Sequence, residues 1–387
     1  MVRIDALLKL MVQRGASALH LSAGAPPTLR VDGHLVPSEL EKLTTESCQA
    51  LVYSILNGSQ KARFEADGEV DTSFGIKGVA RLRMMVFRQR GSVAAALRLV
   101  PTRNPTLAEL GLPAALESLV AAVERGLILV AGHSGAGKSN TVASVVDWIN
   151  RNRSAHILSV ERSLERLHYH ERSIVNQVET GYQGEAFLDA LRRAHRQDAD
   201  VVVISELDDP DSVPTALSLA ESGRLVLATL HAPDAISALA RLLDAFPPHR
   251  QDRARSQLSL ALQAVLVQSL LPHASGRGRV LACELVIATP ALRTALRAGR
   301  LEELTAAIPE ARDSGAQSMN ESLAVLVSQG RLSRGTALAE SPNPDELAQL
   351  LTKRPAKGAS KGEKQDQAFN PLQDLDSNAL EGILSSI

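Results

Sequence analysis

The chain changes character near residue 112, where continuous apolar runs begin to alternate with stretches of helical periodicity. Four of these runs are rich in Val, Ile and Leu, and they cover residues 126–131, 156–160, 201–205 and 225–230. Strands that are apolar on both faces are typical of a parallel sheet covered by helices on each side. We therefore expect an α/β core here, followed by mainly helical structure over residues 252–338.

The first hundred residues carry shorter strand signals. Residues 18–22 predict a strand, and residues 29–36 surround an Asp32-Gly33 pair that is typical of a tight hairpin. A helical stretch at 48–64 is followed by two more strand-like runs at 80–87 and 93–100. This pattern predicts a small α+β domain over residues 1–100. Prolines at 101 and 105 oppose regular structure, so we expect a linker over residues 101–113.

Composition narrows the class of protein only a little. The 387 residues are 44% hydrophobic and 22% charged, which is ordinary globular usage, and the length favours two or three domains. A net charge of −1 gives no global basic field for nucleic acid or an anionic membrane. Cys48 and Cys283 are isolated in the sequence and cannot form a zinc site alone, so we expect buried thiols in a reducing compartment.

The two ends of the chain complete this outline. The N-terminus has charges spread through it and no small-residue cleavage site, which indicates an amphipathic helix rather than a signal peptide. No apolar run approaches the roughly 18 residues that a membrane span needs. Residues 341–387 are rich in Pro, Lys, Gln and Ser, so we expect a disordered tail. We predict a soluble, cytoplasmic protein.

A complete phosphate-binding loop follows the first apolar run. It consists of Gly132, His133, Ser134, Gly135, Ala136, Gly137, Lys138 and Ser139, with Asn140 next. The glycines let backbone N–H groups face phosphate oxygens, Lys138 reaches the β- and γ-phosphates, and the Ser139 hydroxyl is a ligand for Mg²⁺. An apolar strand before it and a helical stretch after it give the strand–loop–helix order that this P-loop requires. The sequence therefore predicts a nucleotide-binding site with Mg²⁺.

Polar residues end three of the predicted strands. Glu206 follows residues 201–205, where it would hold Mg²⁺ through water or orient the attacking water, and Glu161 ends the strand at 156–160 in the same way. His231 ends the strand at 225–230, where a neutral imidazole is suited to sensing the γ-phosphate. No Asn-Lys-x-Asp sequence of a guanine-specific site is present. These residues favour a nucleotide hydrolase.

In this order, these features resemble the secretion-ATPase superfamily, most closely the PilT/PilU-type retraction ATPases of type IV pili. The resemblance extends to about residue 340. The matching segments are 15–22, 26–33 and 78–83 in the first domain, and 132–139, 161–165, 176–177, 190–192, 205–206, 220–223, 228–231, 246–247, 263 and 291–297 in the second. It implies a RecA-like P-loop NTPase core at 114–340 and a PAS-like α+β domain at 1–100.

The resemblance also implies roles for single residues. Glu161 would polarise the attacking water, Glu206 would lie on the Mg²⁺ side, and ATP would be the nucleotide. Arg83 and Arg98 would reach its phosphates from the N-terminal domain, as guanidinium groups stabilise a transferring phosphoryl group. The implied assembly is a homo-hexamer at the cytoplasmic side of the inner membrane, at the pilus base. Its implied partners are a platform protein and a paralogous retraction ATPase, with no nucleic acid.

Three positions depart from the family pattern. The acidic segment Glu-Asp-Pro-Ile-Glu is here Glu161-Arg162-Ser163-Leu164-Glu165, which places a base beside the proposed water-activating residue. The Gly before the Walker B glutamate is Ser205, and the Arg after it is Asp208. We expect slow turnover as a result. Arg162 would shift the ionisation of Glu161 or contact a phosphate, and the sequence leaves both open.

The favoured function is a motor ATPase for pilus retraction and twitching motility, with a tail and an Ala228–Ala232 segment that favour a PilU-like accessory motor. One alternative is an assembly ATPase of a pilus or a type II secretion system, but the four-cysteine zinc insertion and longer N-terminal domain of those relatives are missing. A second is a weakly hydrolysing regulatory subunit of a mixed motor, because of Arg162 and Asp208. A nucleic-acid translocase shares only the RecA-like core.

Overall fold

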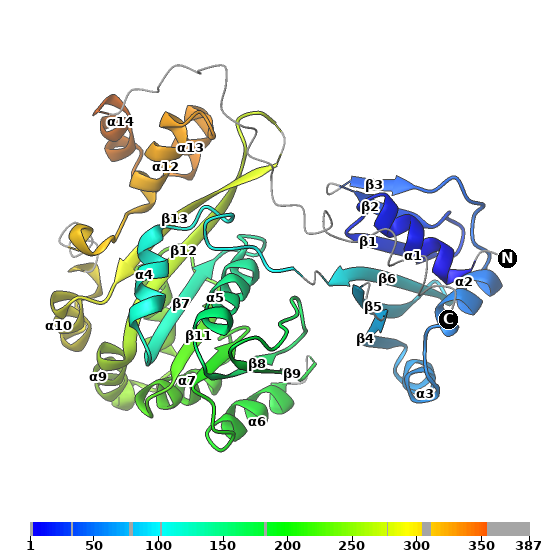
Figure 1. Ribbon diagram of the computed structural model, residues 1–387, viewed down its shortest axis with the longest axis horizontal. Coiled ribbons are helices and arrows are strands. Elements are labelled where there is room, and N and C mark those ends of the chain that lie inside the picture. The colour runs from blue at the N-terminus through cyan, green and yellow to red at the C-terminus, as the bar shows by residue number, and fades with distance from the viewer. Residues whose placement is uncertain are drawn as a thin grey trace. The chain divides into compact units, whose positions relative to one another are not determined.

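The computed structural model describes residues 3–31, 34–76, 80–100, 103–181, 184–276, 278–303 and 311–353 (Figure 1). These residues form two compact units. The first contains the described residues up to Arg103 together with Glu165–Leu167, and the second contains those from Asn104 to Leu164 and from His168 onward. The predicted Asp32-Gly33 hairpin centre and the tail beyond residue 353 lie outside the described residues.

The first unit is built on a six-stranded antiparallel sheet in the order β3-β2-β1-β6-β5-β4. Its strands are β1 Ala18–Ser22, β2 Thr28–Val31, β3 His34–Pro37, β4 Glu69–Ile76, β5 Ala80–Gln89 and β6 Ser92–Val100. Helix α1 (Ile4–Gln13) buries Leu7 and Met11 in the same core as Leu19 and Leu97 of the sheet. The alternation along each strand therefore leaves the opposite side chains, among them Arg98, outside this core.

The helical stretch expected at 48–64 is two helices, α2 (Thr45–Tyr53) and α3 (Gly58–Asp67). Asn57 starts the second one. Its side chain accepts a hydrogen bond from Gln60 N at 2.9 Å, and the Gln60 side chain accepts one from Asn57 N at 3.0 Å. This capping box satisfies two N–H groups that a helix start leaves unpaired, which is why a new helix begins here.

The second unit contains a seven-stranded sheet in the order β13-β12-β7-β11-β10-β8-β9. Its strands are β7 Gly126–Gly132, β8 His156–Glu161, β9 Ile174–Glu179, β10 Val201–Ile204, β11 Leu225–Leu230, β12 Leu262–Pro272 and β13 Arg279–Ile287. All neighbouring pairs are parallel except β12 with β13, which is antiparallel. The predicted α/β class and its four predicted strands are confirmed, with an antiparallel edge strand added.

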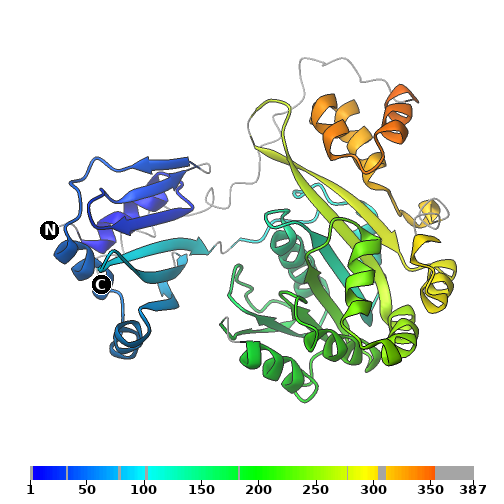
Figure 2. The same cartoon turned by 180° about the vertical axis from the view of Figure 1, so that it is seen from behind.

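Helices cover both faces of this sheet, and Figures 1 and 2 show the two layers from opposite sides. One face packs against α4 (Ala114–Ala122) and α5 (Lys138–Asn152). The other packs against α6 Gly184–Ala194, α7 Ser212–Glu221, α8 Ala235–Asp244, α9 Gln251–Ala261 and α10 Pro290–Ala298. Successive residues of β7 alternate between these two cores, with Leu127 and Leu129 in one and Ile128 and Val130 in the other. The doubly covered sheet predicted from the apolar runs is confirmed.

The helical structure predicted over 252–338 is wrong for β12 and β13, which form a long antiparallel hairpin beside β7. The reason lies in burial. Residues 264–267 of β12 are all buried, so no polar face marks the period of two. An apolar run of this kind cannot be told from a buried helix by periodicity alone.

Helices α12 (Met319–Ser328), α13 (Arg334–Glu340) and α14 (Pro344–Lys353) form a small cluster with the far end of the β12–β13 hairpin. Helix α14 begins where the sequence suggested disorder, because Leu347 and Leu351 are buried in this cluster. Short 3₁₀ turns are η1 Pro248–Arg250, η2 Leu301–Glu303 and η3 Arg312–Ser314. Among the described residues, no helix is both long enough and apolar enough to cross a membrane.

Candidate nucleotide-binding site

The P-loop connects β7 to α5 as the sequence predicts. Gly132 has φ 145°, and a Cβ atom there would lie 2.5 Å from the backbone oxygen of Gln268, so only glycine fits. Gly137 is the N-cap of α5 and has no side chain to satisfy the first N–H groups of the helix. Such a helix start binds anions through those N–H groups and the helix dipole. The loop is therefore shaped to bind phosphate.

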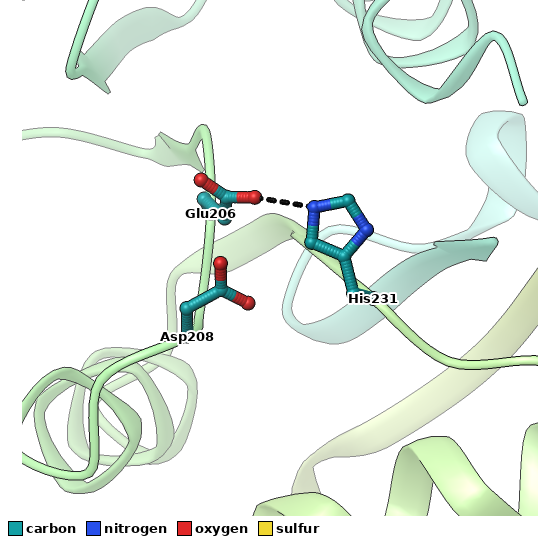
Figure 3. Close-up of side chains that lie close together, drawn as sticks. All are labelled: Glu206, Asp208 and His231. Carbon is teal, nitrogen blue, oxygen red and sulfur yellow. Dashed lines mark ion pairs between the residues drawn. The ribbon is translucent and has the colours of Figure 1, made fainter. Parts of the chain in front are cut away.

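Three of the predicted site residues form one chain of contacts. Lys138 Nζ donates to the backbone oxygens of Gly132 at 2.8 Å and His133 at 3.0 Å, and it lies 3.3 Å from His231 Nδ1. An ammonium group can only donate, so Nδ1 of the imidazole accepts and Nε2 carries the proton. His231 Nε2 lies 2.7 Å from Glu206 Oε1 (Figure 3). Lys138 of the P-loop is thus connected to Glu206 through His231.

Backbone contacts hold Glu206 and His231 in register. Strands β10 and β11 are parallel neighbours, so Glu206 and His231 follow them at the same edge of the sheet. Beyond the strands, Leu207 N donates to Thr229 O at 2.8 Å, and the Thr229 hydroxyl donates to Ser205 O. The two loops are therefore fixed to each other at the point where their polar side chains meet.

The electrostatic environment of Glu206 differs from that of a surface carboxylate. Burial raises the pKa of Glu206 above its usual value, and the adjacent Asp208 carboxylate raises it further, whereas His231 acts in the opposite direction. Asp208 in turn lies 3.9 Å from Arg241 Nη2 of α8. Two carboxylates close together favour either a shared proton or a bound cation.

Glu161 ends β8, the neighbour of β10. Its Oε1 accepts hydrogen bonds from Ser159 Oγ at 2.7 Å and from Gln177 Nε2 at 3.0 Å. The backbone of the Glu206 loop is close by, since Ser205 N donates to Val160 O at 3.1 Å. The two predicted acids therefore lie at neighbouring strand ends on one edge of the sheet.

The side chain of Arg162 contacts the hydrophobic core, and its influence on Glu161 or on a phosphate stays a prediction. Its guanidinium lies over the ring of Phe187 in α6, 4.7 Å from the ring centroid, and its backbone N donates to Ser205 Oγ at 3.2 Å. Phe187 is fully buried, so this cation–π contact places Arg162 on the hydrophobic core beneath α6.

Arg83 and Arg98 belong to the first unit, where they face each other on β5 and β6. Arg83 binds the carboxylate of Asp71 through two nitrogens of its guanidinium group. Its Nε donates to Asp71 Oδ1 at 3.0 Å, and its Nη2 forms an ion pair with Oδ2. Arg98 is exposed. Their contact with a nucleotide remains a prediction.

Sequence reasoning missed three participants in this site. Gln268 of β12 is buried behind the P-loop and donates from Nε2 to Thr141 Oγ1 of α5 at 2.8 Å. Arg241 donates to the backbone oxygen of His231 at 3.0 Å. Asp208, noted only as a departure from the family pattern, shares one cluster with Glu206 and His231. No local signal marks Gln268 or Arg241, because each reaches the site through tertiary structure.

The residues present also fit a magnesium ion. Ser139 is exposed on the first turn of α5, and Glu206 supplies a carboxylate just beyond β10, at the same edge of the sheet. Mg²⁺ prefers oxygen ligands and retains several waters when it is held by one or two carboxylates.

The parallel doubly covered sheet, the P-loop and the acids at the neighbouring strand ends define a RecA-like P-loop nucleotide-binding protein. Residues 2–337 match the family model of Type II/IV secretion system proteins, and the chain belongs to this family.

Several relatives match nearly the whole chain. The type IV pilus retraction ATPase PilT of Pseudomonas aeruginosa is 38% identical over 344 residues, which cover 89% of this chain and 99% of that protein. The type IV pilus ATPase PilU of the same organism is 34% identical over 350 residues, which cover 90% of this chain and 91% of that protein. A crystal structure of the pilus retraction motor PilT with bound ADP superposes with a TM-score of 0.84 and 42% identity, covering 90% of this chain and all of that one.

Proposed function

We propose that this chain is a motor ATPase that couples ATP hydrolysis to retraction of type IV pili. The observation that carries the proposal is the chain of contacts from Lys138 through His231 to Glu206, at a complete P-loop, in a chain similar over nearly its full length to PilT and PilU. The ADP in the similar PilT structure supports a nucleotide at this loop.

In this proposal the backbone N–H groups at the start of α5 bind the β-phosphate. Lys138 leaves the two backbone oxygens that it now contacts and moves to the β- and γ-phosphates. Ser139 and Glu206 hold Mg²⁺, which when bound offsets charge on the phosphate oxygens. His231 loses its lysine contact at the same time, so the imidazole can respond to the γ-phosphate.

Glu161 accepts a proton from the attacking water, and Ser159 and Gln177 fix the position of its carboxylate. Arg83 and Arg98 neutralise charge on the transferring phosphoryl group from the N-terminal domain, which we assign to residues 1–100. Arg83 must then release Asp71, so its salt bridge would have to be exchanged for the phosphate contact. Residues 114–340 form the motor domain, joined to the N-terminal domain by a linker at 101–113.

The proposed assembly is a homo-hexamer that works on the cytoplasmic side of the inner membrane at the pilus base. It would act on a membrane-embedded platform protein and could combine with a paralogous retraction ATPase; the similarity to both PilT and PilU supports either place in such a pair. Nucleic acid has no role in this proposal.

A second candidate is a weakly hydrolysing regulatory subunit of a mixed motor. It is favoured by one observation: Arg162, which takes the place of an acid in the family pattern, is bound to the core at Phe187 and supplies no carboxylate beside Glu161.

The steady-state ATPase rate of the purified chain separates these two candidates. A motor enzyme loses about 10²- to 10³-fold of its rate when a charge-stabilising donor such as Lys138 is replaced by alanine, and Glu206→Gln also lowers the rate. A wild-type rate equal to that of both variants leaves only the regulatory subunit. Deletion of the gene then tests whether the motor retracts or assembles pili. A retraction motor predicts excess surface pili with loss of twitching, whereas loss of pili would indicate an assembly ATPase.

A further inference from the structure

The carboxylates of Glu206 and Asp208 and the imidazole of His231 converge at the ends of β10 and β11 (Figure 3). One ligand atom from each residue lies within 4.8 Å of the other two. Each side chain is about one third exposed, so an ion from solvent can reach the group. The backbone bond from Leu207 N to Thr229 O holds together the two loops that carry these side chains.

We propose that Glu206, Asp208 and His231 form a binding site for a first-row transition-metal dication such as Mn²⁺, and that this site is formed before nucleotide binds. The proposal rests on the proposed function for placing this edge of the sheet on the metal side of the nucleotide. It adds two ligands, Asp208 and His231, to the Mg²⁺ role expected of Glu206 and Ser139, and it makes Asp208 a determinant of metal choice.

The chemistry of the three ligands determines the class of ion. Two carboxylates and one imidazole nitrogen suit Mn²⁺, Fe²⁺, Co²⁺ and Zn²⁺, whereas Mg²⁺ strongly prefers oxygen and Ca²⁺ takes six to eight oxygens. The charges of the neighbouring residues also favour a dication. Two carboxylates supply two negative charges, and the nearby Arg241 offsets them with one guanidinium that is 3.9 Å from Asp208 and half exposed. A dication between the carboxylates removes the remaining repulsion.

The proposal also links metal binding to the P-loop lysine. His231 presently offers Nδ1 to Lys138 and Nε2 to Glu206. A neutral imidazole that binds a metal through Nε2 carries its proton on Nδ1, and Nδ1–H cannot accept a hydrogen bond from an ammonium group. Binding of the metal therefore displaces Lys138 from His231 and leaves the lysine available to phosphate.

The test is a titration of the full-length, nucleotide-free protein with Mn²⁺, followed through the electron paramagnetic resonance signal of free Mn²⁺. We expect one bound Mn²⁺ per chain, retained against a tenfold excess of Mg²⁺. Asp208→Asn should weaken binding by about tenfold or more, because a ligand is lost. Asp211→Asn is the matched control, since it removes the same charge from an exposed position three residues away and should bind as the wild type does.

Two further variants make the outcome specific. Bound Mn²⁺ should show nitrogen hyperfine coupling from an imidazole, and His231→Gln should abolish that coupling. Lys138→Ala should bind Mn²⁺ at least as tightly as the wild type, although it loses ATPase activity. Absence of Mn²⁺ binding without nucleotide, equal affinity of wild type and Asp208→Asn, or a bound ion without nitrogen coupling would overturn the inference. In each case the Mg²⁺-dependent ATPase of the wild type reports separately on the proposed function.

Discussion

Glu161 ends β8, Glu206 lies just beyond the end of the neighbouring β10, and the contacts described for the two carboxylates differ. Glu161 accepts hydrogen bonds from two uncharged donors, Ser159 and Gln177. Glu206 is placed against a second carboxylate, Asp208, and against His231, and burial raises its pKa. Hydrogen bonds from Ser159 and Gln177 position Glu161, whereas burial, and after it the Asp208 carboxylate, raise the pKa of Glu206. These different neighbours suit the two roles that we propose, water orientation for Glu161 and cation binding for Glu206.

The substitution expected to have the largest effect removes the charge of Glu161. Glu161→Gln keeps the size of the side chain and its acceptor oxygen but cannot take a proton from water. We expect kcat for ATP hydrolysis to fall by about 10²- to 10⁴-fold, the usual range for a general base, with little change in KM. A fall in kcat below tenfold, measured in a coupled ATPase assay, would remove Glu161 from the water-activating role.

Loss of the hydrogen bond that positions Glu161 should have a smaller effect. Gln177→Ala removes the Nε2 donor, and we expect kcat to fall by about tenfold, because a misplaced base still retains its chemistry. Asn176→Ala is the matched control on β9, since its amide contacts His156 instead. Equal kcat values for the two variants would show that Gln177 does not position the base.

Glu284 of β13 provides a third comparison, because burial and the nearby Asp234 carboxylate raise its pKa as burial and Asp208 raise that of Glu206. Burial raises the pKa of Glu284 from 4.5 to about 6, although its carboxylate accepts a hydrogen bond from Ala235 N, which acts to lower it. The folded state then holds this proton more tightly than the unfolded state does. Its contribution to stability is therefore present at acid pH and falls as the pH rises from 4.5 through about 6, by about 2 kcal/mol.

Glu284→Gln should abolish this loss of stability between pH 4.5 and pH 7.5. Chemical denaturation at pH 4.5 and pH 7.5 measures it as the difference in unfolding free energy between variant and wild type. Glu340→Gln is the control, because Glu340 is exposed. A difference between Glu284→Gln and wild type that does not change with pH would show that burial of Glu284 does not shift its proton affinity.

The smallest effect is expected at Arg162. Arg162→Asp restores the acid of the family pattern but removes the cation from the ring of Phe187. We expect the unfolding free energy to fall by about 0.5–1 kcal/mol. Arg162→Lys retains the charge without the planar group and should lose less. If Arg162→Asp raises kcat more than about tenfold without loss of stability, Arg162 acts on Glu161 rather than on the core.

The sequence was sufficient for those parts of the site that local patterns specify. The P-loop and the strand before it follow from glycines, a lysine and an apolar run, and Glu161, Glu206 and His231 follow from their places just after apolar runs. The core class followed from the same runs. The contact between Lys138 and His231 could not be predicted, because it depends on β7 lying beside β11, and a single sequence does not give strand order.

Other features could not be predicted from the sequence, for similar physical reasons. Strand β12 is buried on both faces and has no polar alternation, so the sequence did not predict it. The position of Gln268 behind the P-loop could therefore not be predicted either. The partner of Arg162 is Phe187, which lies on a later helix and is brought near by packing of α6 on the sheet. Sequence patterns thus predicted the candidate residues at the strand ends, and the tertiary structure shows which residues contact them.

The hydrogen bond from Arg241 to the backbone oxygen of His231 connects this edge of the sheet to helix α8. Helix α8 begins four residues after His231, and the Asp234 side chain fixes its start by accepting from Ser237 N. The short connection and the arginine together tie His231 to two points of α8. A displacement of His231 when the γ-phosphate departs would therefore move the helix as a rigid rod instead of being absorbed in a loop, which turns a chemical event into movement of a whole structural element.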